Sequence, residues 1–156
     1  MKVTLLVVGS VRGAMASPVA EYEERASRYW RLGVRGVAAG AGRKASANEV
    51  RKAEEERLLP HLPASGQVVA LTRKGKGLSS RKLARFLETR ALRSVPEIAF
   101  VIGGAHGLGE KVLKRAEVRL SLSPMTLPHE VAHLVLVEQL YRAGTILRNE
   151  PYHKGP

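Results

Sequence analysis

The chain has 156 residues, 44% of them hydrophobic and only 4% aromatic, which suffices for one domain with a sizeable, mainly aliphatic core. Lys and Arg outnumber Asp and Glu by 26 to 14, and a formal charge of +12 indicates a polyanionic partner, most often nucleic acid, unless the charges only solvate the surface. The sequence has no cysteine, which excludes disulfides, cysteine nucleophiles and thiolate metal sites.

The first predicted element is a strand over Val3–Val8, a continuous aliphatic run that ends at Gly9. This run of about six apolar residues is too short for a signal-peptide core or a membrane span, so we expect a cytoplasmic protein with no membrane partner. A loop follows, and Pro18 is suited to the first turn of a helix that carries its amphipathic face over 21–31. A short strand is expected over 33–39.

The middle of the chain repeats the alternation of helix and strand. Ser46 and Glu49 form a capping box, in which each side chain satisfies a free backbone N–H of the other. The helix that they begin is expected to stop at Pro60. The next expected elements are a strand over 67–71, a basic glycine-containing turn over 72–77, and a helix capped by Ser79 or Ser80 that runs to about residue 92.

Two further apolar runs, Ile98–Ile102 and Val118–Leu122, each end in a turn of small or rigid residues. The first turn, 103–109, contains four glycines, and the second covers 121–128. A buried strand that breaks into such a turn is the usual way in which an α/β protein brings bare backbone to a ligand. Two turns at the same edge of a sheet would make one pocket.

A short helix over 110–116 lies between the two runs, and the longest helix is expected from His129 to about Leu147. Its apolar residues lie on several faces, which indicates burial by more than one neighbour, another subunit among the candidates. Because strands alternate with helices throughout, the expected fold is a single α/β domain over 1–156, with a mostly parallel sheet and helices on both faces.

The glycine turn matches neither common nucleotide-binding motif. Its pattern is GGxxGxG rather than GxGxxG, and Lys111 lacks the Gly-Lys-Ser/Thr context of a P-loop. The alternative to a ligand site is a tight turn that binds nothing.

The segment His129-Glu130-Val131-Ala132-His133 is a literal HExxH motif, the pattern by which zinc peptidases hold their metal. No third ligand follows at a diagnostic spacing. A coincidental pair of histidines at a helix start is therefore the favoured interpretation, and no metal is expected.

Near the C-terminus, Tyr152, His153 and Lys154 combine an aromatic ring, an imidazole and a cation. Such a set suits the gripping of an unstacked RNA base, whereas a chain terminus is often disordered. Composition leaves both interpretations open.

Several segments together resemble one family. FVIGGAHGL, LSLSPMTLPHEVAHLVLVEQLYRAGTI and PYHKG look like its signature segments, and KVTLLVVG, EYEERASRY and VVALTRKGKGLSS fit it too. The family is that of the large-subunit ribosomal RNA pseudouridine N3-methyltransferases, within the SPOUT superfamily. The likeness covers nearly the whole chain.

The resemblance implies an α/β fold with a deep C-terminal trefoil knot, a homodimer, and S-adenosylmethionine as methyl donor. It further implies methylation of N3 of a pseudouridine in 23S rRNA, on the assembled ribosome or large subunit. Carried over by position, the donor-binding residues are Leu71, Gly103, Gly104, Ser123, Pro124, Met125, Thr126, Leu127 and Pro128. Catalytic roles fall in the same way on Arg142, Tyr152, His153 and Lys154, with Glu138 in the same dimer-spanning site.

Two positions depart from the family pattern. Thr72 stands where the family usually has Asp, and His133 stands where it usually has Arg, which is what creates the apparent HExxH. The remaining alternatives to a methyltransferase are a zinc-dependent hydrolase and a ribosome-binding factor without enzymatic activity.

Overall fold

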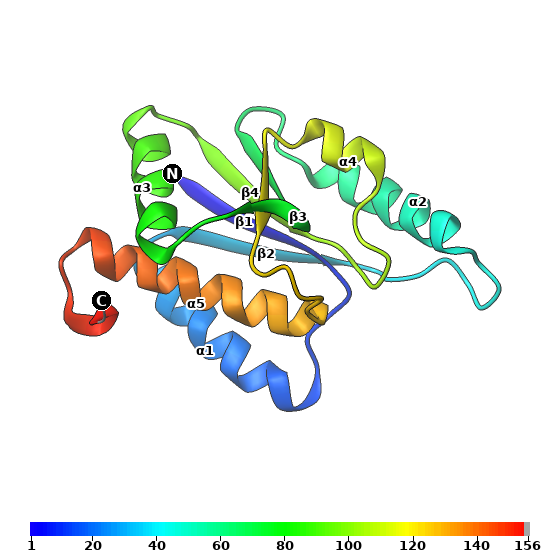
Figure 1. The fold of residues 1–156 in the computed structure, drawn as a ribbon, viewed down its shortest axis with the longest axis horizontal. Coiled ribbons are helices and arrows are strands. Elements are labelled where there is room, and N and C mark those ends of the chain that lie inside the picture. The colour runs from blue at the N-terminus through cyan, green and yellow to red at the C-terminus, as the bar shows by residue number, and fades with distance from the viewer. Residues whose placement is uncertain (155–156) are drawn as a thin grey trace.

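Five strands form one sheet in the order β2-β1-β4-β3-β5, and every neighbouring pair is parallel (Figure 1). The computed structural model describes residues 1–154, so Gly155 and Pro156, at the end of the PYHKG segment, lie outside it. The strands are β1 Lys2–Val8, β2 Arg31–Val37, β3 Gln67–Gly77, β4 Glu97–Ile102 and β5 Val118–Ser121. The α-helices are α1 Ala16–Ser27, α2 Ala47–Leu58, α3 Ser80–Leu92, α4 Glu110–Arg115 and α5 His129–Leu147. Single 3-10 turns cover Gly13–Met15, Leu59–His61 and Pro151–His153.

Helices cover both faces of the sheet, which confirms the predicted α/β architecture. Alternate residues of β1 divide the core: Val3, Leu5 and Val7 pack with α1, α3 and α5, whereas Leu6 and Val8 pack with α2 and α4. In Figure 1, α1 and α5 lie side by side on one side of the sheet, and α2 and α4 lie together on the other. No helix among residues 1–154 is both long and apolar enough to cross a bilayer.

The predicted helix caps are confirmed at α2 and α3. Glu49 N–H donates to Ser46 Oγ at 3.2 Å, and Ser46 N–H donates to Glu49 Oε1 at 3.3 Å. At α3 the capping residue is Ser79 rather than Ser80, and Ser79 Oγ accepts from Lys82 N–H at 3.2 Å. Each cap satisfies backbone donors that a helix start leaves free.

The prediction of a turn over 72–77 was wrong, because β3 continues to Gly77. Leu71 and Lys76 both pair with Leu120 of β5, so residues 72–75 form a bulge between two paired halves of the strand. A Cβ on Gly75 would lie only 2.7 Å from the backbone of Arg119 and Leu120. The glycine thus allows β3 to pass close to β5 rather than ending the strand.

The first helix also differs from expectation. Pro18 lies in its first turn, as predicted, but the helix ends at Ser27 rather than at residue 31. The chain then turns into β2, and Trp30 fills the core, where its indole N–H donates to the carbonyl oxygen of Leu140 at 2.8 Å.

The long helix α5 has the predicted bounds and is buried by more than one neighbour, as its apolar pattern indicated. It packs against α1 and α3, and the middle of the helix is fully buried at Leu136, Val137 and Leu140. Its first residue, His129, comes directly after the segment 123–128, and its C-terminus leads into the tail. One helix therefore connects the two candidate regions of the site.

Candidate active site

The glycine turn between β4 and α4 leaves no room for side chains. A Cβ on Gly103 would lie 2.9 Å from the carbonyl carbon of Gly107, and a Cβ on Gly104 would lie 2.9 Å from Glu54 Oε2. Gly107 has φ +79° and its N–H donates to Gly104 O at 3.0 Å, which closes the turn. At Gly103 and Gly104 the turn thus presents main chain, not side chains, at the end of the strand.

The segment 123–128 leaves β5 in a fixed path but with much of its surface exposed. Ser121 Oγ donates to Ser123 O, and Met125 N–H donates to Ser123 Oγ, each at 3.0 Å. Met125 is 72% exposed, which is unusual for a large apolar side chain. An exposed apolar side chain on a pinned loop is suited to contact with an apolar ligand surface.

The predicted donor-binding residues converge at one edge of the sheet. Leu71 pairs with Leu120 of β5, and the residue before it, Ala70, pairs with Val101 of β4. Gly103 and Gly104 follow β4 directly, and 123–128 follows β5. Gly103 and 123–128 thus lie at the carboxyl ends of β4 and β5, where α/β proteins commonly bind ligands, and Leu71 lies between them at the point where β3 enters its bulge.

A second cluster forms around the carboxylate of Glu138 on α5. Arg142 donates to Oε1 from Nε at 3.0 Å and from Nη2 at 2.6 Å, and Tyr152 O–H donates to the same oxygen at 3.0 Å. The other oxygen accepts from Gln139 Nε2 at 2.6 Å. We call this the Glu138 hub. It brings together two of the four predicted catalytic residues, Arg142 and Tyr152.

The hub fixes the protonation of its members. The hydrogen bond to Glu138 raises the pKa of Arg142, which therefore stays charged. Burial, with hydrogen bonds to Tyr22 and Glu138, raises the pKa of Tyr152, which stays a neutral donor near pH 7.

The tail is docked onto the helices, so the expectation of a disordered terminus does not hold for residues up to Lys154. Asn149 adopts φ +54°, and Glu150 N–H reaches back to Thr145 O at 2.9 Å, which ends α5 in a left-handed turn. Tyr29 O–H then donates to Glu150, and this hydrogen bond raises the pKa of Tyr29 to about 12. The tail thereby returns along α1.

All four tyrosines of the chain meet where α1, α5 and the tail join. The ring of Tyr141 lies 4.5 Å from that of Tyr152, 5.7 Å from that of Tyr29 and 6.2 Å from that of Tyr22, measured between centroids. Arg142 lies over the Tyr152 ring at 4.8 Å. Aromatic contacts thus hold the tail beside the Glu138 hub.

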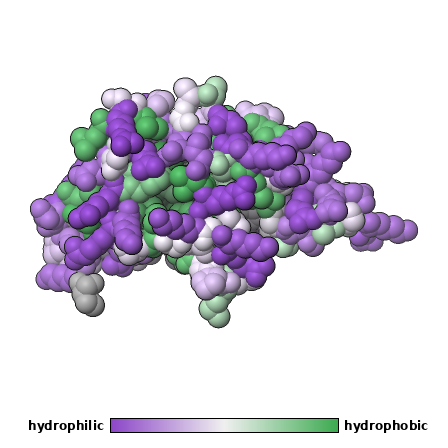
Figure 2. Space-filling view, turned by 45° about the horizontal axis from the view of Figure 1, so that its top comes forward, coloured by the Kyte–Doolittle hydropathy of each residue, from purple (hydrophilic) through white to green (hydrophobic). Residues whose placement is uncertain are grey.

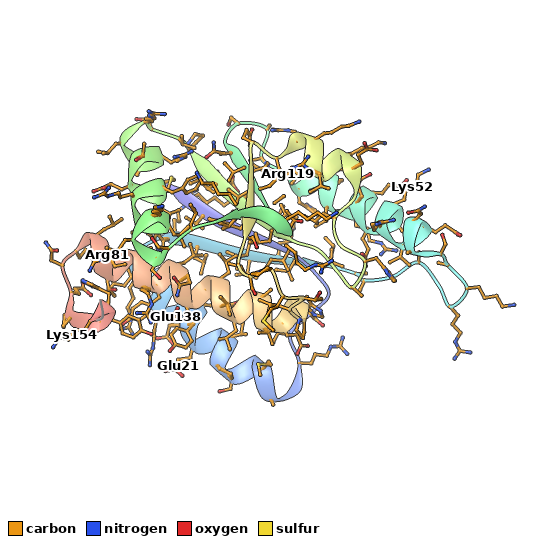
Figure 3. All side chains as sticks on the ribbon, in the orientation of Figure 1. Glu21, Lys52, Arg81, Arg119, Glu138 and Lys154 are labelled. Atoms are coloured by element: carbon orange, nitrogen blue, oxygen red, sulfur yellow. The ribbon has the colours of Figure 1, made fainter. Side chains whose placement is uncertain are left out.

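The other two predicted catalytic residues do not join the hub. His153 is half-buried, and its Nδ1 is buried without a hydrogen-bond partner among the described residues. Lys154 is exposed, and Figure 3 shows it at the end of the tail, on the same side of the molecule as Glu138. The structure therefore groups Arg142 with Tyr152 and leaves His153 and Lys154 at the margin.

Comparison with known proteins identifies the family of this chain. A family model described as "Predicted SPOUT methyltransferase" matches residues 1–153. The chain belongs to the SPOUT methyltransferase family.

Curated SPOUT relatives match over their full length. A protein of Gemmatimonas aurantiaca named ribosomal RNA large subunit methyltransferase H is 53% identical over 155 residues, which are 99% of this chain and 100% of that protein. One of the same name from Syntrophotalea carbinolica is 44% identical over 154 residues, 98% of this chain and 99% of that protein.

Solved structures show the same fold at low identity. A putative methylase family protein from Neisseria gonorrhoeae superposes with a TM-score of 0.56 at 12% identity, covering 90% of this chain and 81% of its own. A putative methyltransferase from Legionella pneumophila, in complex with the bound cofactor SAM, superposes with a TM-score of 0.51 at 13% identity. The match covers 92% of this chain and 66% of that one.

The HExxH motif of this SPOUT chain does not form a metal centre. His133 is buried, and its Nε2 lies 2.7 Å from Glu23 Oε1 on α1, whereas His129 Nε2 lies 3.4 Å from the carbonyl oxygen of Ser10. The two imidazoles are thus directed at different elements. Within residues 1–154, no three His, Cys, Asp or Glu side chains are placed to share a metal ion.

Two glutamates behind the glycine turn were missed by sequence reasoning. Glu54 is 3% exposed and its Oε2 accepts from Gly40 N–H at 2.9 Å, while Oε1 faces Gly104. Glu55 Oε2 accepts from the N–H groups of Lys111 and Val112 at 2.7 and 3.2 Å and so holds the start of α4. In the sequence they lie within a charged helix, and no pattern marks them as buried.

Proposed function

We propose that this protein transfers a methyl group from S-adenosylmethionine to N3 of a pseudouridine in 23S rRNA, on the assembled ribosome or the large subunit. The observation that carries the proposal is the convergence of Gly103–Gly104 and the segment 123–128, at the carboxyl ends of β4 and β5, with Leu71 before the bulge of β3 between them. The names of the curated relatives, which the chain matches over nearly its whole length, support rRNA as the substrate.

The donor-binding residues fit the chemistry of S-adenosylmethionine. The glycine turn offers backbone N–H and C=O groups with no side chain in the way, which suits an adenine and a ribose held by main chain. The exposed Met125 and Pro124 offer apolar contact to the adenine faces. Leu71 closes the site from β3, and the Thr72 departure falls in the bulge beyond it.

When bound, the donor supplies an activated sulfonium methyl, whose carbon–sulfur bond breaks with its electron pair remaining on sulfur as the bond to N3 forms. The protein must therefore hold the base with N3 in line and favour loss of the N3 proton, to water or to His153. Arg142 supplies a fixed positive charge beside the ring anion, and Lys154 adds to it. Tyr152 and His153 place the base, so positioning supplies most of the catalysis.

The basic surface of β3 and α3 supports ribosome binding. Residues 72–96 contain eight Lys or Arg against one acidic residue, Glu88, so this segment carries +7 of the chain's net +12. Arg73, Lys74 and Lys76 are exposed on β3, and Arg81 and Lys82 are exposed on the first turn of α3. Figure 2 shows many hydrophilic side chains on one face of the molecule, with smaller hydrophobic patches between them. Contacts with rRNA phosphates would supply salt-sensitive affinity.

Methyl transfer to pseudouridine-containing large subunits and ribosomes tests the function. With labelled S-adenosylmethionine, we expect one methyl group per particle at N3 of a pseudouridine, and no transfer by Gly104→Val, whose side chain collides with Glu54 and Val8. Calorimetric titration with the donor, alone and with ribosomes present, checks the binding step. Ribosome binding without donor binding would instead indicate a non-enzymatic binding factor.

We further propose that the active unit is a cytoplasmic homodimer whose site spans two copies, and that the chain is knotted where the two halves of β3 flank Leu120. Uncovered apolar surface supports a partner copy: Val34 on the edge strand β2 is 44% exposed and, with Val19 and Ala20 of α1, lines a cavity of about 290 Å³. The tail follows the C-terminal end of α5, whereas the donor segment precedes its N-terminal end. The two regions of one chain are therefore separated by the length of the helix, which supports a site shared between two copies.

Mixing two inactive variants tests the shared site. Gly104→Val disables the donor turn, and Lys154→Glu disables the tail. If each site combines the donor turn of one copy with the tail of the other, randomly mixed dimers should recover about a quarter of the wild-type rate, because one intact site forms in each heterodimer. If the mixture stays as inactive as its components, each site lies within one chain.

A further inference from the structure

A second cavity lies beside the donor segment, between the start of α3, the end of β5 and the middle of α5. Its volume is about 440 Å³, within the range of roughly 300–1,000 Å³ for pockets that hold small ligands. Leucine and valine side chains form its walls, among them Leu78, Leu122 and Val135. Its polar groups are few and come from Ser79, Ser80, Ser121 and Gln139.

The cavity occupies the space between the two halves of the candidate active site. On one side, Ser121 is hydrogen-bonded to Ser123, the first residue of the donor segment. On the other side, Gln139 is hydrogen-bonded to Glu138, which holds Arg142 and Tyr152. In Figure 3 the start of α3, marked by Arg81, lies beside the part of α5 that carries Glu138. The acceptor base must reach the methyl group at the donor segment, and Ser121 and Leu122 in the cavity wall lie directly before that segment in the chain.

The amide of Gln139 is held in one orientation within this cavity. Ser80 Oγ donates to Gln139 Oε1 at 2.6 Å, and Gln139 Nε2 donates to Glu138 Oε2 at 2.6 Å. A carboxylate only accepts hydrogen bonds, so the NH₂ group of the amide must face Glu138. One N–H of Nε2 and one lone pair of Oε1 remain available to a ligand.

We propose that this cavity receives the target base and that Gln139 reads the edge by which pseudouridine differs from uridine; this rests on the proposed function. Pseudouridine is joined to ribose through carbon, so its ring keeps an N1–H beside the O2 carbonyl. In uridine, N1 is bonded to the sugar and has no hydrogen. The free acceptor and donor of the Gln139 amide match N1–H and O2 side by side.

This pairing also explains which nitrogen is left to react. With N1–H and O2 held by Gln139, the edge that carries N3 and O4 points away from the amide. N3 is then free to face the donor segment and the charge of Arg142. A site built around a hydrogen bond to the substrate rejects an analogue that lacks the bonding group, because the protein's own polar group is left unpaired.

The test compares Gln139→Met with wild type on two kinds of ribosome, one with pseudouridine and one with uridine at the target position. Methionine keeps the length of the side chain and removes both hydrogen-bonding atoms. Methyl-transfer kcat/KM is measured on each, as is ribosome affinity with S-adenosylhomocysteine present, which reports discrimination even where uridine is not methylated. We expect the preference for pseudouridine to fall roughly 10- to 100-fold, mainly through weaker binding of pseudouridine-containing ribosomes.

Two further variants sharpen this test. Gln67→Met alters the other glutamine of the chain, whose Oε1 accepts from Arg90 Nε at 2.9 Å at the far end of β3, and should keep full discrimination. Ser80→Ala leaves the Gln139 amide in place but removes one of its two orienting bonds, so a smaller loss in the same direction is expected. Circular dichroism establishes that each variant is folded.

Three outcomes would overturn the inference. Unchanged discrimination in both Gln139→Met and Ser80→Ala would mean that the amide does not read the base. Weaker donor binding in Gln139→Met, with discrimination intact, would assign the cavity to the donor. If the wild type binds and methylates both kinds of ribosome equally, the protein does not distinguish pseudouridine from uridine. Failure of the proposed function itself looks different, because the wild type would then methylate neither.

Discussion

Replacing Glu138 by glutamine is expected to lower kcat about a hundredfold while donor affinity stays within about twofold of wild type. The carboxylate accepts hydrogen bonds from Arg142, Tyr152 and Gln139 and so holds all three side chains together. An amide presents hydrogens where one oxygen now accepts, so at least one of the three partners must turn away. A misplacement of about 1 Å suffices for a loss of this size.

The measurement is the single-turnover rate of methyl transfer, with donor and ribosomes both saturating. Glu56→Gln is the matched control, since Glu56 is exposed on α2 and the same change of charge there should leave the rate unaltered. A normal rate in Glu138→Gln would show that the hub holds the tail in place without orienting the reaction. A loss of donor affinity in this variant would instead connect the hub to the donor site.

Gly144→Ala is expected to lower the free energy of unfolding by about 2 kcal/mol, although alanine is the better helix former. A Cβ at this position would lie 2.3–2.6 Å from three atoms of Tyr29, so Tyr29, in the turn after α1, must move away from α5. Overpacking of this kind costs about 1–3 kcal/mol or more, against a gain of roughly 1 kcal/mol in helix propensity. Tyr29 must also shift from Glu150, which loosens the tail.

Thermal unfolding followed by circular dichroism should show a fall in Tm of about 4–8 °C. Gly77→Ala serves as control, because nothing lies within 4 Å of a Cβ built there and its backbone is not left-handed. An unchanged Tm for Gly144→Ala would mean that Tyr29 can move away from α5 with little loss of stability. Activity should fall together with stability in Gly144→Ala, since the tail depends on Tyr29.

Local sequence signals predicted most of the fold because they act over a few residues. The capping residues at Ser46 and Ser79 fixed two helix starts, and the Pro128–His129 junction fixed the start of α5. The error at 72–77 has the opposite cause. Glycines alternating with lysines resemble a turn, but this stretch pairs with β5, about forty residues later, and no local pattern reports such a partner.

The candidate site, like the fold, has one part that the sequence predicts and another that it does not. The position of a pocket between the two turns could be predicted because strand ends of a parallel sheet meet at one edge, whereas the individual donor-binding residues are assigned only through the family resemblance. The contacts that organise the acceptor side join residues 59 apart, as between Ser80 and Gln139, or 121 apart, as between Tyr29 and Glu150. Ser80 is a candidate helix cap and Gln139 lies in a family segment, but nothing in the sequence pairs the two residues, and only the packing of α3 on α5 brings them together.

The gathering of the four tyrosines at the junction of α1, α5 and the tail has a spectroscopic consequence. Trp30, the only tryptophan of the chain, lies in the same region and is bonded to Leu140 of α5. Near-ultraviolet emission of the unlabelled protein therefore arises almost wholly from this junction, and energy absorbed by the tyrosines passes to a single acceptor. Any movement of the tail would change the distance of Tyr152 from that acceptor, so the protein carries its own optical probe of the position of its tail.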